Sequence, residues 1–357
     1  MAGRYLAQKT VAQRALGRIE SHLGHALGWP TSHQPDQLVL TSSRTEAVLA
    51  SRTGADFVLY RGDCQGLLAE LPANSVDLIV SSPPYFMGKP YDRSDKTQDF
   101  ELDHMILAPL LARVLKPGGS LCWQVGMHVK HNEILPLDYL AYSAFAKDRS
   151  LVLRNRIIWH FEHGAHARHR FSGRYETILW FTKGDSYPFH LDEVRIPQKY
   201  PGKRHYKGPR KGEYSGNPLG KNPSDVWIIP NVKAKHIEKT AHPCQFPVAI
   251  PQRLVRALTD IGDLVLDPFA GVASSGVAAV LENRRFIGCE IDKNYASMGN
   301  RRYEELKAGG LRVRDWDRPV ALPDYRQAVA QTPTHFVRTD DGPASKDSKR
   351  EEKRRSQ

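Results

Sequence analysis

The chain has 357 residues, of which 40% are hydrophobic and 25% charged, as in an ordinary globular protein with a sizeable core. Its formal net charge of +12 favours a polyanionic partner such as nucleic acid, the alternative being a basic tail on an unrelated enzyme. Four dispersed cysteines without a CxxC pair argue against a disulfide framework or a cysteine-built zinc site, and no window approaches the ~20 apolar residues of a membrane span. We therefore expect a soluble cytoplasmic protein with no membrane partner.

The N-terminal part of the chain is predicted to be an arm outside the main domain. Apolar residues at helical spacing over residues 8–27 predict an amphipathic helix, which could pack on a second subunit in a homodimer. The polar, turn-rich segment that follows, to about Ser51, has the composition of a linker.

From Phe57 onward, strands alternate with helices. The predicted strands are FVLYRGDC, LIVSSPPY, SLCWQVG, DLVLDPFAG and RFIGCEID, with helices over His104–Leu115, around Leu254–Leu258 and up to Val280. RNRIIWHF and YETILWFTKGD predict an extended hairpin. This alternation predicts an α/β fold: a mainly parallel sheet with helices on both faces and an antiparallel edge hairpin.

A glycine-containing turn follows the strand LVLD and leads into a helix. Such a turn brings the backbone close to a ligand at the carboxyl ends of parallel strands, although many α/β proteins use one only for packing. The next strand ends in GCEID, which places Glu290 where it can accept hydrogen bonds from ribose hydroxyls.

Taken together, RGDC, SSPPY, DPFAG and GCEID resemble the motifs of the S-adenosylmethionine-dependent amino-methyltransferases of DNA. The resemblance runs from about Phe57 to Tyr303. SPPY precedes DPFAG, which is the circularly permuted order of the family's beta group. The resemblance implies a Rossmann-like methyltransferase fold, S-adenosylmethionine as the cofactor and double-stranded DNA as the substrate.

The resemblance also assigns residues to the cofactor. Asp267, Phe269 and Gly271 would line its methionine and adenosine side, Glu290 would hold the ribose, and Asp63 would contact the adenine. The element HPCQFP would pack around the methionine through His242, Phe246 and Pro247. One departure is Ala273, where the family usually has a glycine; its methyl group could crowd the approach of the backbone.

SSPPY is predicted to hold the base. An exocyclic amine is a poor nucleophile because its lone pair is delocalised into the ring, and two acceptors around the NH2 group favour the tetrahedral transition state. In the family these are the Ser82 hydroxyl and the Pro83 carbonyl, while Pro84 stiffens the turn and Tyr85 stacks on a base rotated out of the duplex. On its own, the motif would be read as a strand-ending turn.

Two other motifs are set aside. Pro243-Cys244 resembles the nucleophilic Pro-Cys of the carbon-5 cytosine methylases, but it precedes the cofactor motif, so Cys244 is predicted to be a packing residue. Four histidines at a spacing of three (His160, His163, His166 and His169) have only Glu162 as a nearby acid, which disfavours a metal site.

Two basic segments are predicted to contact DNA. Residues 195–239 hold eleven Lys and Arg against three acids, with tyrosines interleaved, where the family keeps its target-recognition segment; the alternative is a solvated basic loop. The connection between the hairpin strands is also basic. The predicted DNA-binding residues are Arg168, Arg170, Arg174, Lys199, Lys203, Arg204, Lys207, Arg210, Lys211 and Lys221.

The sequence therefore divides into five predicted parts: a helical arm and linker (1–55), the catalytic part of a methyltransferase domain (56–194), a target-recognition segment (195–239), the cofactor-binding part (240–308) and a disordered charged tail (309–357).

We expect a site-specific DNA methyltransferase acting on cytosine N4, because serine at the first motif position tends to accompany that target in the family. Adenine N6 is the alternative. More distant alternatives are a non-catalytic DNA-binding protein on a methylase scaffold and an RNA or protein amine methylase. A cognate restriction endonuclease would be the partner if the protein is not a solitary methylase.

Overall fold

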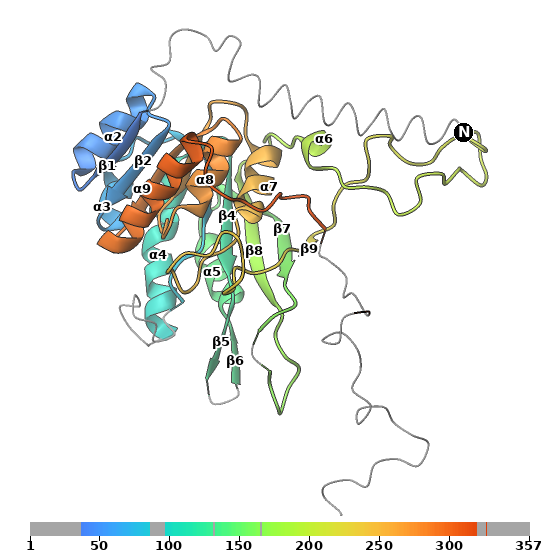
Figure 1. The fold of residues 1–357 in the computed structure, drawn as a ribbon, viewed down its shortest axis with the longest axis horizontal. Helices are drawn as coiled ribbons and strands as arrows, with labels where there is room; N and C mark the ends of the chain where they lie inside the picture. The colour runs from blue at the N-terminus through green and yellow to red at the C-terminus, as the bar shows by residue number, and fades with distance from the viewer. Residues whose placement is uncertain (1–36, 86–96, 131–132, 165, 320–325, 327–357) are drawn as a thin grey trace, which may run out of the picture. The chain divides into compact units, whose positions relative to one another are not determined.

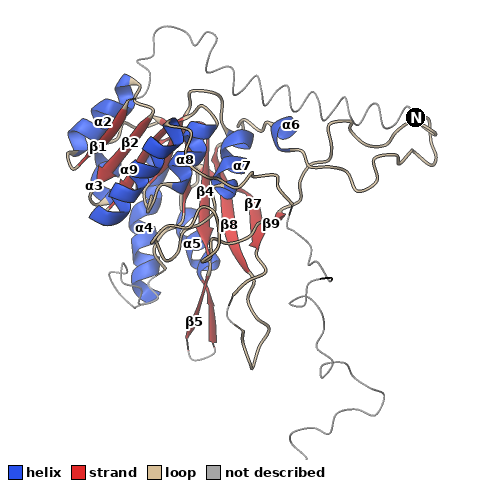
Figure 2. Ribbon diagram, in the orientation of Figure 1, coloured by secondary structure: helices blue, strands red, loops and turns tan. Residues whose placement is uncertain are grey.

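The computed structural model describes residues 37–85, 97–130, 133–164, 166–319 and 326, and these contain a nine-stranded sheet (Figures 1 and 2). The first six strands in spatial order pair in parallel, β8 is antiparallel to both its neighbours, and β9 is parallel to β7. The predicted α/β fold with an antiparallel hairpin is confirmed. Across the sheet the strands are β1 (Leu38–Thr41), β2 (Phe57–Arg61), β11 (Arg285–Glu290), β10 (Leu264–Asp267), β3 (Val76–Ser81), β4 (Leu115–Val125), β8 (Tyr175–Lys183), β7 (Leu151–His160) and β9 (Val226–Ile228).

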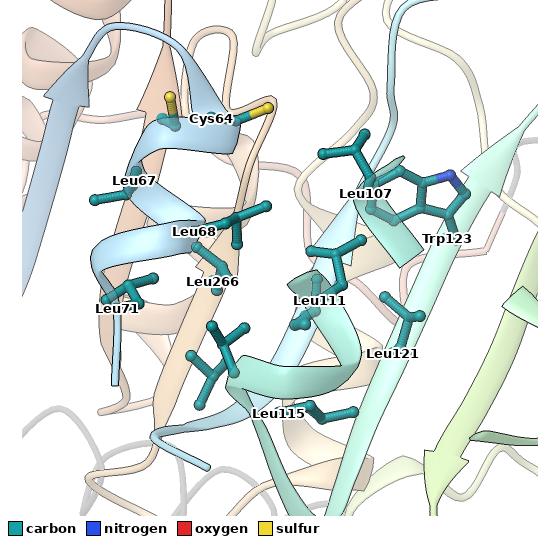
Figure 3. Close-up of a cluster of buried hydrophobic side chains, with 14 of the residues drawn as sticks. Cys64, Leu67, Leu68, Leu71, Leu107, Leu111, Leu115, Leu121, Trp123 and Leu266 are labelled. Atoms are coloured by element: carbon teal, nitrogen blue, oxygen red, sulfur yellow. The ribbon is translucent and has the colours of Figure 1, made fainter. Parts of the chain in front are cut away.

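Helices cover both faces of the sheet. One face carries α2 (Arg44–Thr53), α3 (Cys64–Glu70), α4 (Thr97–Val114) and α5 (Leu137–Phe145); the other carries α7 (Ala249–Leu258), α8 (Ser274–Leu281) and α9 (Lys293–Lys307). Figure 3 shows part of the first core, where leucines of α4 lie beside Leu121 and Trp123 of β4, and Leu68 of α3 lies beside Leu266 of β10. Alternate residues of one strand are buried in the two cores, Val58 in the first and Phe57 in the second. Because both faces of the strands are buried, their sequences are continuous apolar runs.

Three smaller elements lie outside these layers. The short helix α6 (Leu191–Val194) lies beside α7, where His190 N donates to Ala257 O at 2.7 Å. The strands β5 (Met127–Lys130) and β6 (Glu133–Pro136) form a separate hairpin that continues from β4. Of the described helices, none is long and apolar enough to cross a bilayer.

The segment predicted to be a linker before Ser51 is instead part of the sheet. Residues 38–41 form the edge strand β1, and Arg44–Thr53 forms α2. The Ser43 hydroxyl caps this helix by accepting a hydrogen bond from Glu46 N at 3.3 Å. The strand is too short to show a period, but Ser-x-x-Glu is a capping signal that the sequence does contain. The amphipathic helix predicted over residues 8–27 lies outside the described residues.

The first residues of the segment predicted to be a disordered tail are packed against the domain. Arg314 N donates to Glu238 Oε1 at 3.0 Å, and the Trp316 ring lies 5.3 Å from the Arg253 guanidinium and 5.2 Å from that of Arg256. Residues 311–318 are therefore packed against the cofactor-binding part. The chain divides into two units, 1–318 and 319–357, and only Pro319 and Arg326 of the second are described.

Candidate active site

The sheet brings the two principal motifs together. SSPPY follows β3 and DPFAG follows β10, and these strands are parallel neighbours, with Val265 opposite Leu78 and Leu266 opposite Ile79. Both motifs therefore leave the sheet at the same edge. The Ser81 hydroxyl donates to Asp267 Oδ1 at 2.5 Å across 186 positions of sequence, which ties one motif directly to the other.

The Asp267 carboxylate joins the two motifs through several hydrogen bonds. It also accepts from the Ser275 hydroxyl and from Phe269 N at 3.0 Å, and the residue is fully buried. Burial raises the pKa of its carboxyl group to about 6. Asp267 was expected to line the cofactor side, but it lies beneath the cavity wall. Its role in this arrangement is to position the two motifs.

We expect Asp267→Ala to lower the free energy of unfolding by about 3 kcal/mol, because the two serine hydroxyls and the amide that donate to the carboxyl group would lose their acceptor. In the wild type, the carboxyl pKa is higher in the folded chain than in the unfolded chain, where it is about 3.9. This shift adds stability that is fully present below about pH 4 and is lost as the pH rises through about 6. Urea unfolding of the wild type, Asp267→Ala and Asp267→Asn between pH 4.5 and 7.5 measures both effects. Equal stability of the wild type and Asp267→Ala at every pH would contradict this role.

A cavity of about 440 Å³ opens at the carboxyl ends of the parallel strands, a volume suited to a small-molecule cofactor. Ten of the twelve predicted catalytic and cofactor residues line it, and Asp267 and Pro247 do not. Those in the wall are Asp63, Ser82, Pro83, Pro84, Tyr85, His242, Phe246, Phe269, Gly271 and Glu290.

One wall of the cavity is a polar cluster around Tyr85. The Tyr85 hydroxyl donates to Glu176 Oε2 at 3.0 Å and lies 3.4 Å from the Ser82 hydroxyl oxygen. Gln124 Nε2 donates to the Tyr85 oxygen at 3.3 Å and to the Glu176 carboxylate. A Cβ placed at Gly126 would lie 3.1 Å from the Tyr85 ring, so the absence of a side chain at Gly126 leaves room for the ring. These contacts fix the plane of the ring beside Ser82.

Glu176 and Gln124 are site residues that the sequence did not reveal. Burial raises the pKa of the Glu176 carboxyl group, while its hydrogen bonds to Tyr85 and Gln124 oppose that rise. Burial also raises the pKa of the Tyr85 hydroxyl well above its usual value, so the phenol stays protonated and donates. The available signal was a single acid in the otherwise apolar strand YETILWF.

A second part of the cavity wall is built from Gly271 and Glu290. Gly271 has φ +55°, and its amide donates to Glu290 Oε2 at 2.8 Å, while Asp292 N donates to Glu290 Oε1 at 2.7 Å. A Cβ at Gly271 would point at His242 Nε2, 3.4 Å away. A carboxylate can accept about four hydrogen bonds, so Glu290 keeps acceptor capacity toward the cavity.

His242 is neutral at physiological pH. Its Nδ1 accepts from Cys244 N at 3.3 Å, and its ring packs edge-on against Tyr295 with centroids 4.5 Å apart. Burial lowers the pKa of its imidazole to about 4. An uncharged ring at this position does not repel a cationic ligand. Asp63, another lining residue, caps α3 by accepting from Gly66 N at 3.2 Å.

One sequence expectation about this cavity is wrong. Cys244 was expected to be a packing residue, but it is exposed and lines the cavity. For Ala273, the sequence left open whether its methyl group crowds the approach of the backbone to the cofactor. Ala273 is fully buried in the left-handed conformation (φ 55°), and its methyl group lies 3.2 Å from a Cβ placed at Gly299 of α9, away from the cavity wall.

The β7–β8 loop, residues 161–174, reaches the cavity. Phe161 and Gly173 line it, and Arg168, Arg170 and Arg174 lie in the same loop. Among the residues that the structure describes, no group of three His, Cys, Asp or Glu side chains is arranged to hold a metal ion.

The segment 195–225 lies elsewhere. Since β8 is antiparallel to β4, it ends where β4 begins, and Lys183 Nζ donates to Leu115 O at 2.8 Å. The chain then passes α6 and runs out and back through a bridge between Ile196 and Lys221 (Figure 1). The seven basic residues predicted here to bind DNA, from Lys199 to Lys221, are exposed, and none lines the cavity. The loop that carries the three arginines therefore borders the cavity, whereas these seven residues lie on a segment that starts from the other end of the sheet.

Known proteins are similar to this chain in sequence and in fold. Residues 76–301 match the N6/N4 family model described as DNA methylase. The type II methyltransferase M.BglII of Bacillus subtilis is 45% identical over 241 residues, which cover 67% of each chain. The DNA adenine methyltransferase YhdJ of Escherichia coli (strain K12) is 33% identical over 253 residues, 69% of this chain and 82% of that one. The structure of PvuII DNA methyltransferase (cytosine-N4-specific) has the same fold, with a TM-score of 0.56 at 18% identity over 80% of this chain and 99% of that one. The chain therefore belongs to the N6/N4 DNA methylase family.

Proposed function

We propose that this protein transfers a methyl group from S-adenosylmethionine to N4 of a cytosine at a specific site in duplex DNA. The observation that carries the proposal is the pairing of two walls in one cavity. Ser82, Pro83 and Tyr85 form the wall suited to an amine-bearing base, and Gly271 and Glu290 form the one suited to a nucleoside cofactor. Membership of the N6/N4 DNA methylase family supports an amino group of DNA as the acceptor.

The cofactor fits the residues of the second wall. Gly271 offers backbone where a side chain would intrude, Glu290 offers acceptors for ribose hydroxyls, and neutral His242 tolerates a positive charge. Asp63, Phe246 and Phe269 complete the lining. When bound, S-adenosylmethionine supplies an electrophilic methyl group on a sulfonium sulfur. Asp267 and Pro247 would support these residues from outside the cavity.

The first wall would prepare the amine. The Ser82 hydroxyl oxygen and the Pro83 carbonyl accept its two hydrogens, which draws the lone pair out of conjugation with the ring. Pro83 and Pro84 hold the backbone so that the carbonyl is oriented before the base arrives. Tyr85, fixed by Glu176 and Gln124, stacks on the base. These intact features favour catalysis over a non-catalytic scaffold.

The choice of cytosine N4 rests on Ser82 at the first position of SPPY. Adenine N6 is the second candidate, favoured by the 33% identity to a relative named as a DNA adenine methyltransferase. Mass spectrometry of nucleosides from DNA of cells that express the protein decides between them. We expect N4-methylcytosine; N6-methyladenine would select the second candidate, and the absence of both would contradict the proposal.

We expect the segment 195–225 to bind DNA phosphates when the duplex is present. Lys199, Lys203 and Lys207 are exposed there. Replacing all three by alanine should lower the slope of log K against log salt by about one for each phosphate that is no longer neutralised. Titration of fluorescent duplex DNA at several salt concentrations measures this slope. An unchanged slope would show that the segment does not touch DNA.

Several finer assignments accompany the proposal. The order of SPPY before DPFAG supports the beta group. A cognate restriction endonuclease and a homodimer stay predictions.

A further inference from the structure

The tip of the β7–β8 loop carries a phenylalanine that is fully exposed to solvent. Phe171 is 100% exposed, more than any other large hydrophobic side chain in the described residues. Burial in a core would stabilise such a ring, so its position outside any core calls for a partner surface. The residues before it are Arg168, His169 and Arg170.

Hydrogen bonds hold this tip in a defined form. Ala167 N donates to the Ser172 hydroxyl at 3.1 Å, which closes the chain around residues 168–171. The Arg170 guanidinium donates to Phe171 O at 3.1 Å. At the base of the loop, Phe161 N donates to Arg174 O at 2.8 Å and extends the hairpin ladder. These hydrogen bonds therefore fix the backbone that carries the Phe171 ring.

The base of the loop is part of the active-site wall. Phe161, Gly173 and Tyr175 line the cavity, next to Glu176, which holds Tyr85. A Cβ at Gly173 would lie 3.3 Å from the sulfur of Met127, another lining residue. Figure 1 shows the loop projecting beyond the sheet next to the β5–β6 hairpin. The tip thus lies beyond the rim of the cavity.

A base that reaches Tyr85 has left its stack, and the duplex then contains a gap. Apolar side chains such as phenylalanine insert at such positions and stack on the neighbouring bases, and flanking arginines bind the phosphates. We propose that Phe171 inserts into the duplex where the target base has left and thereby keeps that base in the cavity. This inference rests on the proposed function, because it requires a duplex DNA substrate.

The test compares two DNA substrates. The first is a duplex carrying the site at which the wild-type protein methylates DNA, mapped beforehand; the second has an abasic site opposite the target base, which is then unpaired. Phe171→Ala should lower kcat/KM on the paired duplex by about 10- to 100-fold and on the abasic duplex by less than about threefold. Phe171→Trp, which keeps an aromatic ring, should retain most of the activity on both.

Each other result overturns the inference. Equal losses on the two substrates would assign Phe171 to general DNA binding, and unchanged rates on both would show that it does not touch the duplex. Leu49→Ala is the matched control, because Leu49 is 59% exposed on α2 at the other edge of the sheet, and its rates should not change. A wild-type protein that methylates no DNA would overturn the proposed function itself, which is distinguishable from a failure confined to Phe171.

Discussion

Replacing Tyr85 with alanine is expected to lower methyl transfer to duplex DNA on the order of 100-fold while cofactor binding is retained. Base–aromatic stacking is worth about 1–3 kcal/mol, and the misplaced amine adds to that loss. The polar contacts of Tyr85 are with Ser82, Gln124 and Glu176, whereas Gly271 bonds to Glu290, so removal of the ring should leave the cofactor side intact. Single-turnover rates and cofactor titration by calorimetry measure the two effects separately.

Tyr85→Phe is the matched control. It keeps the stacking surface but loses the hydroxyl that donates to Glu176 at 3.0 Å. Because Gln124 still donates to Glu176, we expect an intermediate loss of about 10-fold. If Tyr85→Ala instead abolished cofactor binding, Tyr85 would belong to the cofactor wall.

Glu290→Ala should weaken S-adenosylmethionine binding on the order of 100-fold, because hydrogen bonds to a charged group are worth about 1.5–3 kcal/mol each. The substitution also leaves Gly271 N and Asp292 N without their acceptor, which loosens the turn that approaches the cofactor. Calorimetric titration gives the affinity, and the rate at saturating cofactor should fall much less.

A stability measurement separates the two causes of this effect. If Glu290→Ala unfolds at nearly the wild-type urea concentration yet binds cofactor weakly, the weaker binding comes from the missing hydrogen bonds to the cofactor. Unchanged cofactor affinity would remove Glu290 from the ribose site.

Much of the central fold could be predicted because its strands are buried on both faces. FVLY, LIVS and LVLD are continuous apolar runs, and each ends in a motif with turn-forming or acidic residues. Parallel strands share a carboxyl edge, so the motifs that follow neighbouring strands lie together. The bond between Ser81 and Asp267 confirms that the ends of β3 and β10 come together.

Glu176 could not be predicted, because its role depends on strand register. It lies on β8, opposite Trp159 of β7, and reaches Tyr85 only because β8 is antiparallel to β4 and begins at the cavity edge. A single sequence does not encode which distant strand will be its neighbour. The alternation of side chains across the sheet then decides that Glu176 points into the cavity.

The same strand direction explains the position of the basic segment. The positive charge of the segment predicts a polyanionic partner. Composition does not indicate at which end of the sheet the segment lies. Because β8 ends beside the start of β4, residues 195–225 begin away from the cavity, and only after β9 does the chain return, so that Lys233 lines the wall. The direction of the Asp267 side chain could not be predicted from the sequence either. It bonds to Phe269 N and to the Ser275 hydroxyl under the loop and does not point into the cavity.

The most direct test of the central claim is methyl transfer from labelled S-adenosylmethionine to duplex DNA by purified wild-type and Ser82→Ala proteins, with the products digested to nucleosides and identified by mass spectrometry. We expect labelled N4-methylcytosine from the wild type. We expect a rate on the order of 100-fold lower for Ser82→Ala, with cofactor affinity unchanged, because one acceptor for the amine is removed. Label absent from DNA, label in 5-methylcytosine, or a Ser82→Ala rate equal to that of the wild type would contradict the central claim.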